Sequence, residues 1–348
     1  MEKYKNIVSE RIIDRKNYNG VDIVKFICAF FVLCIHVQMF PSKTIGLSFF
    51  EQDNYGIANF LIAQGICRVA VPFFFVATGF FFFSKIDPMH VERERVEKFC
   101  FKLLRAVGIW MVLLFVGKTE HLWYLGASVF GVLVISFCLY KRIKLEYLIV
   151  AALSLYAVGL FGDLYYGALA PVRNIRAIDY IIEIYEKIFY STRNGLFMGL
   201  IFVLMGAAFA YKRIRMPMVV AVIGLIASIA AHYAELIMTT SAGLPKDYNM
   251  SISLLFVAFF LFYIAKSITL ADRPIYKRLR AIGVLIFYMH FLVEWFTRLV
   301  YDQILEHTGK DLLSYVFVTV TPIVILLAVT IEWLSRKEKF SFLRYLYE

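Results

Sequence analysis

Long apolar runs separated by short charged connections fill almost the whole chain. The runs are about 16 to 25 residues long, and a helix that rises 1.5 Å per residue crosses a hydrocarbon core about 30 Å thick over such a length. The pattern therefore predicts an all-α, polytopic membrane helix bundle of about ten transmembrane helices. The expected spans are 21–41, 59–83, 99–116, 122–140, 145–161, 195–211, 216–238, 250–270, 281–305 and 314–334.

The distribution of Lys and Arg outside the spans predicts the orientation of the bundle. Cytoplasmic segments of membrane proteins carry an excess of these residues. With ten spans, the segments on one side hold 24 Lys and Arg residues and those on the other side hold 8. We expect the richer side to be cytoplasmic. Residues 1–20 and 335–348 are then cytoplasmic segments on either side of one transmembrane domain, 21–334.

Composition excludes several other classes of protein. With 61% hydrophobic and 18% charged residues and a mean hydropathy of +0.72, the chain is far more apolar than a soluble domain. The net charge of +11 forms no contiguous patch, which argues against a nucleic-acid partner. The five cysteines lack metal-ligand spacing and are expected to be small buried hydrophobes, so no metal is expected. No cleavable signal peptide is expected, because the first apolar run is a full span.

One outer connection, 162–194, contains an amphipathic segment at about 175–190. Apolar residues repeat there at helical spacing, with charged residues mostly between them. The pattern predicts either a helix at the outer membrane interface or a helix packed over the mouth of the bundle.

Ionisable residues inside spans are costly and normally face a cavity or a partner. In the first span, Lys25 and His36 are eleven residues apart, which returns a helix to nearly the same face about 16 Å further along its axis. This face would carry a cation at the cytoplasmic entry and an imidazole deeper inside. The alternative is a snorkelling Lys and a His that hydrogen-bonds a neighbouring helix.

The second and ninth spans carry further ionisable residues. Arg68 is expected near mid-depth, where it needs an anionic ligand or a partner such as Glu294. His290, Glu294 and Arg298 share one face of the ninth span, where Glu294 and Arg298 can pair.

At the outer ends of two other spans, His232, Glu235 and Arg193 are candidates for an acceptor site. A solvated rim is the favoured interpretation of these residues. No phosphate-binding loop, dinucleotide fingerprint, metal triad or serine nucleophile elbow occurs in the sequence.

Six motifs in order resemble the acyltransferase-3 family of integral membrane acyltransferases. Lys25 and His36 keep the spacing of the family's opening Arg and His, and Thr78 stands at the Ser position of its second motif. Lys replaces Arg at two positions, 25 and 102, which keeps the charge but loses the bidentate fork. The motifs are GVDIVKFICAFFVLCIH (20–36), RVAVPFFFVATGFFF (68–82), FKLLR (101–105), HLWYL (121–125), TRNGLFMGLIFVLMG (192–206) and FYMHFL (287–292).

The resemblance implies a multi-pass protein of the bacterial inner membrane that modifies the cell envelope. It would move an acyl group, usually acetyl, from cytoplasmic acyl-CoA to a hydroxyl of a surface carbohydrate or similar small polar acceptor. Acyl-CoA would be the donor substrate, with no permanently bound cofactor. The implied catalytic residues are His36 as general base, Arg68 and His290; the acyl-CoA ligands are Lys25, Lys102 and Arg105; and the acceptor ligands are Arg193, His121 and Glu294.

TRNGLF together with HLWYL also resembles one branch in particular, the membrane domain of the membrane-bound serine racemases of vancomycin-type resistance. In that branch the bundle is thought to take up serine. The alternative function is therefore a transporter of serine or another small amino acid, and an inactive membrane scaffold is a third.

Overall fold

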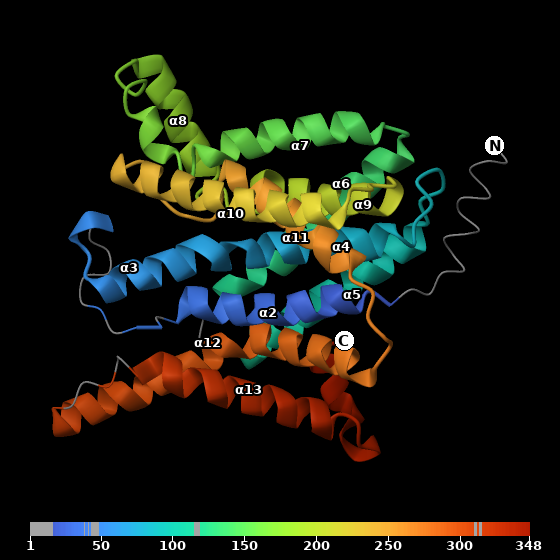
Figure 1. Ribbon diagram of the computed structural model, residues 1–348, viewed down its shortest axis with the longest axis vertical. Helices are drawn as coiled ribbons and strands as arrows, with labels where there is room; N and C mark the ends of the chain where they lie inside the picture. The colour runs from blue at the N-terminus through green and yellow to red at the C-terminus, as the bar shows by residue number, and fades with distance from the viewer. Residues whose placement is uncertain are drawn as a thin grey trace.

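The computed structural model shows a bundle of α-helices with no β-strand in the part of the chain that it describes (Figure 1). The described residues are 17–37, 39–40, 42, 49–114, 119–309, 312 and 315–348. The α-helices are α2 (Asn19–His36), α3 (Asn54–Phe60), α4 (Ala70–Phe83), α5 (Arg93–Leu113), α6 (Trp123–Tyr140), α7 (Leu145–Leu160), α8 (Arg176–Ile188), α9 (Leu200–Tyr211), α10 (Met218–Ser241), α11 (Ile252–Ser267), α12 (Pro274–Thr308) and α13 (Val316–Leu334). Short 3₁₀ and π segments are η1 (Phe49–Glu51), η2 (Leu61–Gly65), η3 (Ile66–Val69), η4 (Glu120–Leu122), η5 (Tyr166–Leu169), η6 (Gly195–Gly199) and η8 (Glu338–Leu346).

The predicted all-α membrane fold is confirmed. Six helical segments are long and apolar enough to cross a membrane, and three shorter apolar helices accompany them: α7, η6 with α9, and α11. The count of ten spans and the cytoplasmic position of both ends stay predictions. Most of the predicted segment 1–20 and the predicted span ends at residues 41, 115–116 and 314 lie outside the described residues. The six are Asn19–His36, Asn54–Phe83, Trp123–Tyr140, Met218–Ser241, Pro274–Thr308 and Val316–Leu334.

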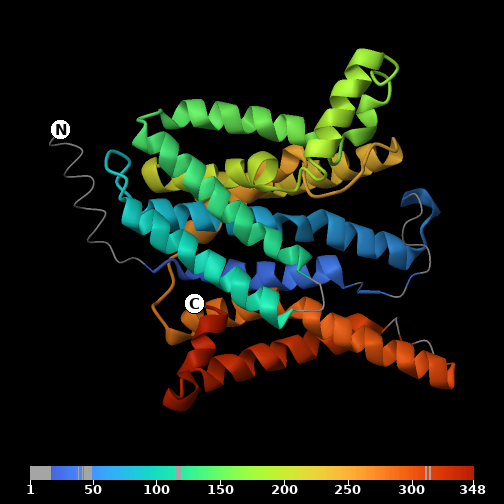
Figure 2. The same ribbon diagram turned by 180° about the vertical axis from the view of Figure 1, so that it is seen from behind.

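The helices lie side by side along their lengths, with α4 and α2 in the middle of the bundle and α13 and α7 at opposite edges (Figures 1 and 2). The start of α2, the connection from α4 to α5 and the C-terminal segment η8 lie at one end of the bundle, and α8 lies at the other. We call the end with η8 the basic end, because the Lys- and Arg-rich connections gather there.

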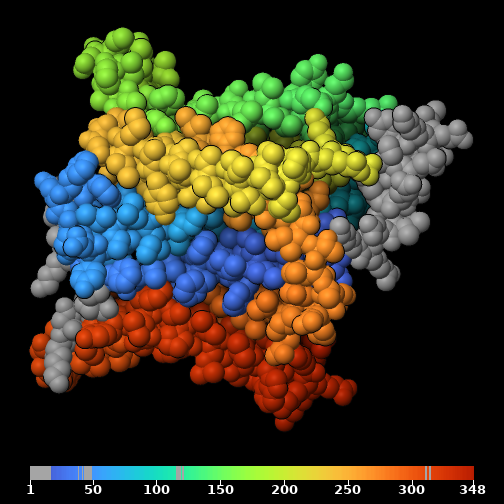
Figure 3. Space-filling view, viewed as in Figure 1, coloured from blue at the N-terminus to red at the C-terminus, as the bar shows by residue number. Residues whose placement is uncertain are grey.

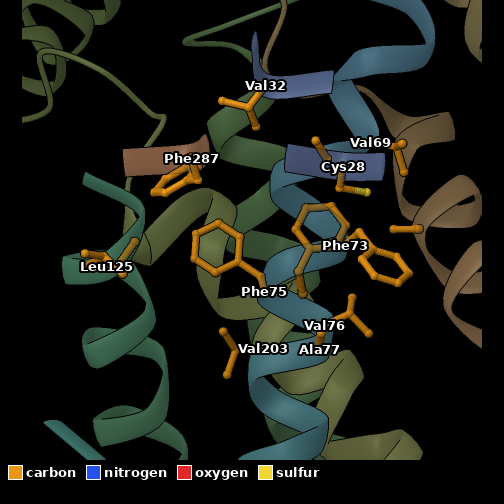
Figure 4. Packing of buried hydrophobic residues seen from close by; sticks show 14 of the residues in the cluster. Cys28, Val32, Val69, Phe73, Phe75, Val76, Ala77, Leu125, Val203 and Phe287 are labelled. Carbon is orange, nitrogen blue, oxygen red and sulfur yellow. The ribbon is translucent and has the colours of Figure 1, made fainter. Parts of the chain in front are cut away.

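Helices α4 and α9 approach so closely that glycine is required at their contact. A Cβ atom on Gly79 would lie 2.0 Å from the Val203 carbonyl oxygen, and one on Gly206 would lie 2.1 Å from the Val76 carbonyl oxygen. Large side chains such as Phe73 and Phe75 fill the space around α4 (Figure 4). Small residues that let helix backbones meet are typical of helix packing in membranes.

The surface of the bundle is apolar over long stretches. Helix α10 lies across the face shown in Figure 3, and its side chains Val219, Ile223 and Ile226 are exposed. A continuous exposed apolar helix face is unfavourable in water but favourable in lipid.

The helix that carries Arg68 is irregular, with a π turn (η2) and a 3₁₀ turn (η3) between α3 and α4. The hydroxyl of Tyr233 on α10 donates a hydrogen bond to the Leu61 carbonyl (3.0 Å) and accepts one from the Ile66 amide (3.2 Å). These bonds satisfy backbone groups that the irregular turns release. The irregularity therefore has a specific partner on a neighbouring helix.

The predicted amphipathic segment forms α8, of which Ile182 is the buried member. Tyr185 and its neighbour Phe189 pack their rings on Phe197 of η6, so one face of α8 covers the end of the bundle. Ile181 and Ile188 remain exposed on another face. The predicted packing over the mouth of the bundle is therefore observed for one face, and the position of the other face at the membrane interface stays a prediction.

Candidate functional site

Three histidines from separate elements meet inside the bundle. The ring of His290 (α12) lies 5.4 Å from that of His36 (α2) and 5.2 Å from that of His121 (η4), measured between centroids. Phe291 contacts all three, with centroid distances of 4.5 Å, 4.7 Å and 4.6 Å to His36, His121 and His290. We call these three residues the histidine cluster. Among the described residues, no group of three His, Cys, Asp or Glu side chains has the arrangement of a metal site.

The hydrogen bonds of His290 fix which of its ring nitrogens carries the proton. Its Nδ1 lies 2.8 Å from the Phe287 carbonyl oxygen and 3.2 Å from the Ile286 carbonyl oxygen. A carbonyl oxygen only accepts, so Nδ1 donates and the neutral ring keeps its lone pair on Nε2. Nε2 is buried and has no hydrogen-bond partner within the described residues. The lone pair on Nε2 can therefore accept a proton, and no hydrogen-bond donor among the described residues occupies it.

A cavity of about 590 Å³ opens at the basic end of the bundle. Three of the cations that line it are paired: Arg95 with Glu92, Lys98 with Glu94, and Arg280 with Asp22. The other three have no ion-pair partner in the part of the chain that the structure describes, so their charge is available to an anion. The six cations that line the cavity are Lys25, Lys85, Arg95, Lys98, Lys102 and Arg280.

The deep part of the cavity is lined by hydroxyl and aromatic groups. The Thr78 and Tyr124 hydroxyls lie 2.8 Å apart and form one hydrogen bond. Phe287 lines the same region, and its ring lies 5.5 Å from that of His121 and 6.3 Å from that of His290. The three histidines do not line the cavity. Phe287 therefore stands between the cavity and the histidine cluster.

Lys25 and His36, which were predicted to share one face of the first span, lie in different surroundings. Lys25 lines the cavity, and its ammonium group lies 4.6 Å from the Phe81 ring centroid. His36 lies at the far end of the same helix, in the histidine cluster beyond Phe287. Lys102 also lines the cavity, whereas Arg105 lies beside it with its guanidinium 5.1 Å from the Tyr345 ring centroid.

Arg68 has polar partners other than the one weighed from the sequence. Its Nη1 donates to Asn249 Oδ1 (2.6 Å) and its Nε donates to Gln64 Oε1 (2.7 Å). Asp247 lies 4.0 Å from Nη2. Glu294, which was considered as the partner of Arg68, pairs instead with Arg298 at 2.9 Å, the alternative that the i, i+4 spacing also allows.

Asp163 supports the group that holds Arg68. This carboxylate, which the sequence did not single out, accepts hydrogen bonds from the Asn249 amide nitrogen (2.8 Å), the Met250 amide nitrogen (3.0 Å) and Asn249 Nδ2 (3.2 Å). Burial raises the pKa of Asp163 to about 6, and the charge of Asp247 adds to that effect. Asp163 thus orients the Asn249 side chain, whose oxygen accepts from Arg68.

The match to a known family covers most of the chain. An acyltransferase domain is recognised over residues 18–336. The chain belongs to the acyltransferase-3 family. It is also a multi-pass membrane protein, since this membership combines with six helices long and apolar enough to cross a bilayer.

Three curated relatives of this acyltransferase-3 protein match over shorter stretches. Two are named amino-acid racemase, both from Enterococcus faecalis, and are 29% and 27% identical over 55% and 56% of the chain. The third is named serine/alanine racemase, from Enterococcus gallinarum, and is 26% identical over 70% of the chain. The matches span only 28%, 29% and 36% of these relatives' own lengths. No solved structure matches the chain.

The expected solvated rim is wrong for His232, whereas Glu235 and Arg193 are partly exposed. His232 is 4% exposed, and its Nδ1 lies 2.9 Å from the Ser251 hydroxyl. Glu235 accepts from the Ile252 and Ser253 amides at 2.7 Å and 2.9 Å, which satisfies free donors at the start of α11. Both residues fix the α10–α11 connection. Arg193, the third candidate there, lies over the Trp123 ring at 5.6 Å.

Several residues of the candidate site carry no distinguishing signal in the sequence. Phe287 and Tyr124 are aromatic residues among many, and Tyr345 lies after the last span. His121 was assigned to the acceptor from its motif alone, and the structure places it against His290. Each of these residues is identified by a contact between segments that lie far apart in the sequence, and no local pattern indicates such a contact.

Proposed function

We propose that this acyltransferase-3 protein moves an acyl group, such as acetyl, from cytoplasmic acyl-CoA to a hydroxyl on a surface carbohydrate or similar small polar acceptor. The observation that carries the proposal is the cationic cavity at the basic end, in whose lining the Phe287 ring lies next to the histidine cluster. The cavity is the proposed donor site and the cluster the proposed place of proton transfer.

The charges of the cavity fit the phosphates of coenzyme A. Lys25, Lys85 and Lys102 have no ion-pair partner in the described part of the chain, so a bound polyphosphate does not have to displace a carboxylate from them. With Arg95, Lys98 and Arg280 paired, the three remaining lysines against Glu348 still leave the lining positive. Clefts lined by one sign of charge concentrate oppositely charged ligands. Arg105, beside the cavity, adds a further cation in this proposal.

The reacting groups are proposed to meet near the deep end. One of the Thr78 and Tyr124 hydroxyls donates to the other, and the proton of the second can orient a thioester carbonyl. His36, the partly exposed member of the cluster, is the proposed general base. The acceptor oxygen attacks the thioester carbon, the carbon–sulfur bond breaks, and the hydroxyl proton passes by way of His36 to the departing thiolate. His290, with its free Nε2, is the second proposed proton acceptor.

Two arginines near His36 are proposed to stabilise the developing oxyanion and the acceptor. Arg68 and Arg193 both interact electrostatically with His36. Arg68 is proposed to face the oxyanion. The proposed acceptor ligands are Arg193, His121 and Glu294.

A transfer assay in proteoliposomes tests the proposal. Labelled acetyl-CoA is supplied on the side of the basic end together with candidate carbohydrate acceptors, and acetylated product is measured. We expect transfer that is lost in His36→Ala and His290→Ala. The matched control is His307→Ala, because His307 is an exposed histidine near the far end of α12. Binding of acetyl-CoA without transfer to any acceptor, or full activity of His36→Ala, would contradict the proposed chemistry.

Uptake of a small amino acid is a second candidate function. The matched relatives are named amino-acid racemase and serine/alanine racemase. In this alternative, Arg68, whose side chain is 12% exposed, is proposed to hold a substrate carboxylate. The same vesicles given labelled serine decide between the two functions. Serine accumulation that is lost in Arg68→Ala, without release of coenzyme A, would favour the transporter.

A further inference from the structure

The segment that follows α13 folds back over the cationic cavity. Trp110 Nε1 on α5 donates to the Leu346 carbonyl (2.9 Å), and the Ser335 and Tyr347 hydroxyls lie 2.7 Å apart. Arg344 Nε donates to the Ser335 carbonyl (3.1 Å). These contacts join η8 to both α5 and the end of α13. The predicted cytoplasmic tail is therefore an ordered wall of the cavity.

This wall brings aromatic rings to a lining that is otherwise rich in cations. Tyr345, Tyr347 and Glu348 line the cavity together with Lys85 and Lys102. The Tyr345 side chain is 58% exposed, although its ring lies under the Arg105 guanidinium. A ring supported on one face by a cation and open elsewhere is a platform on which a flat heterocycle can stack.

We infer that η8 supplies the subsite for the adenine base of the donor, with Tyr345 as the stacking residue and Arg105 as the cation behind it. The inference rests on the proposed function, in which the donor is acyl-CoA. It goes further by naming the part of the donor that is recognised and the residues that recognise it. The neighbouring lysines 85, 98 and 102 then face the phosphates of the nucleotide half.

The segment η8 lies outside the matched domain. The recognised acyltransferase domain ends at residue 336, and η8 begins at Glu338. The residues proposed to bind the base therefore lie beyond the matched domain. A donor that lacks a base, such as an acyl phosphate, would gain nothing from Tyr345.

Binding of two halves of coenzyme A to the purified full chain in nanodiscs tests the inference. The probes are adenosine 3′,5′-diphosphate, which carries the base, and 4′-phosphopantetheine, which does not. We expect Tyr345→Ala to weaken binding of the adenosine probe by roughly 5- to 150-fold, the range for loss of one stacked base, and to leave the pantetheine probe unchanged. Tyr345→Phe, which keeps the ring, is expected to bind both probes as the wild type does.

The matched control is Tyr140→Ala. Tyr140 is an exposed tyrosine at the end of α6 with the Lys141 ammonium 5.7 Å from its ring centroid, and it does not line the cavity. This variant is expected to bind both probes normally. If Tyr345→Ala does not fold, nitration of the wild-type protein read by mass spectrometry replaces it, and the adenosine probe is expected to protect Tyr345 but not Tyr140.

The outcomes separate failure of this inference from failure of the proposed function. Binding of the adenosine probe that is unchanged in Tyr345→Ala, or nitration of Tyr345 that is not slowed by the probe, overturns the adenine subsite and leaves acyl-CoA as the donor. Equal loss of both probes in Tyr345→Ala shows that η8 only maintains the fold of the cavity, and also overturns it. A wild-type protein that binds neither probe nor coenzyme A overturns the proposed donor itself.

Discussion

Replacing Asp163 by Asn should stabilise the folded chain at neutral pH while it weakens the site around Arg68. The carboxylate is buried, and its pKa of about 6 exceeds its ordinary value of 3.8. The difference corresponds to about 3 kcal/mol by which the folded state disfavours the charged form. Asn keeps an oxygen for the Asn249 and Met250 amides but loses the bond from Asn249 Nδ2, which is worth about 1 kcal/mol. The expected net gain is about 1–2 kcal/mol.

Two comparisons make this prediction specific. Asp163→Ala removes the acceptor of two buried amides, each of which costs about 1–3 kcal/mol when left without a partner. The Ala variant should therefore be less stable than the Asn variant by about 2–6 kcal/mol. The pH dependence follows from the raised pKa: the folded chain binds the proton more tightly than the unfolded chain. Wild-type stability should therefore rise as the pH falls through about 6 toward about 4, and the advantage of Asn should vanish.

Unfolding of the detergent-solubilised protein by SDS, followed by tryptophan fluorescence at about pH 8 and about pH 5, measures these differences. Transfer activity is measured in parallel and should fall in Asp163→Asn, because Asn249 loses the acceptor that orients its side chain toward Arg68. An Asn variant that is less stable than the wild type at both pH values would refute the reasoning. In that case the attraction of Arg68 for the carboxylate outweighs the cost of burial.

Three further substitutions test the cavity and the packing. Lys102→Ala should raise the KM for acyl-CoA with little change in kcat. Lys98→Ala should raise it less, because Lys98 is already paired with Glu94. Initial rates over a range of acyl-CoA concentrations measure both effects. Phe287→Ala removes the ring between the cavity and the histidine cluster, so release of free thiol from acetyl-CoA without an acceptor should increase; a thiol-reactive dye detects it. Gly206→Ala should destabilise the chain by about 1–3 kcal/mol in the SDS assay, whereas Gly126→Ala, with open space around its Cβ, should not.

The helices were predictable from the sequence because hydrophobic run length is a local property. The ranges 21–41 and 281–305 coincide with most of α2 and α12, and the helical faces of Lys25, His36 and His290 followed from spacing alone. Helix α5 begins at Arg93, well before the expected residue 99, because its first turns carry charged residues and show no apolar run.

The partners of the buried polar groups were not predictable from the sequence. Arg68 was considered with Glu294, but Asn249 and Asp247, from the connection between α10 and α11, reach it instead. His232 was expected at a solvated rim because it lies near the end of a span, and the neighbouring connection buries it. In each case a loop folds over the end of the bundle, and no local sequence pattern predicts which residues a loop will contact.

The glycine contact between α4 and α9 makes one part of the Arg68-bearing span more rigid than the other. Where two backbones touch at Gly79 and Gly206, neither helix can rotate or slide without a steric clash. Helix α4 is therefore held in place at the centre of the bundle. Helix α3 joins it through the π and 3₁₀ turns of residues 61–69, which the Tyr233 hydroxyl supports. A rearrangement of this span would therefore bend it at these turns, beside Arg68, and leave α4 and the part of the cavity lining that it provides in place.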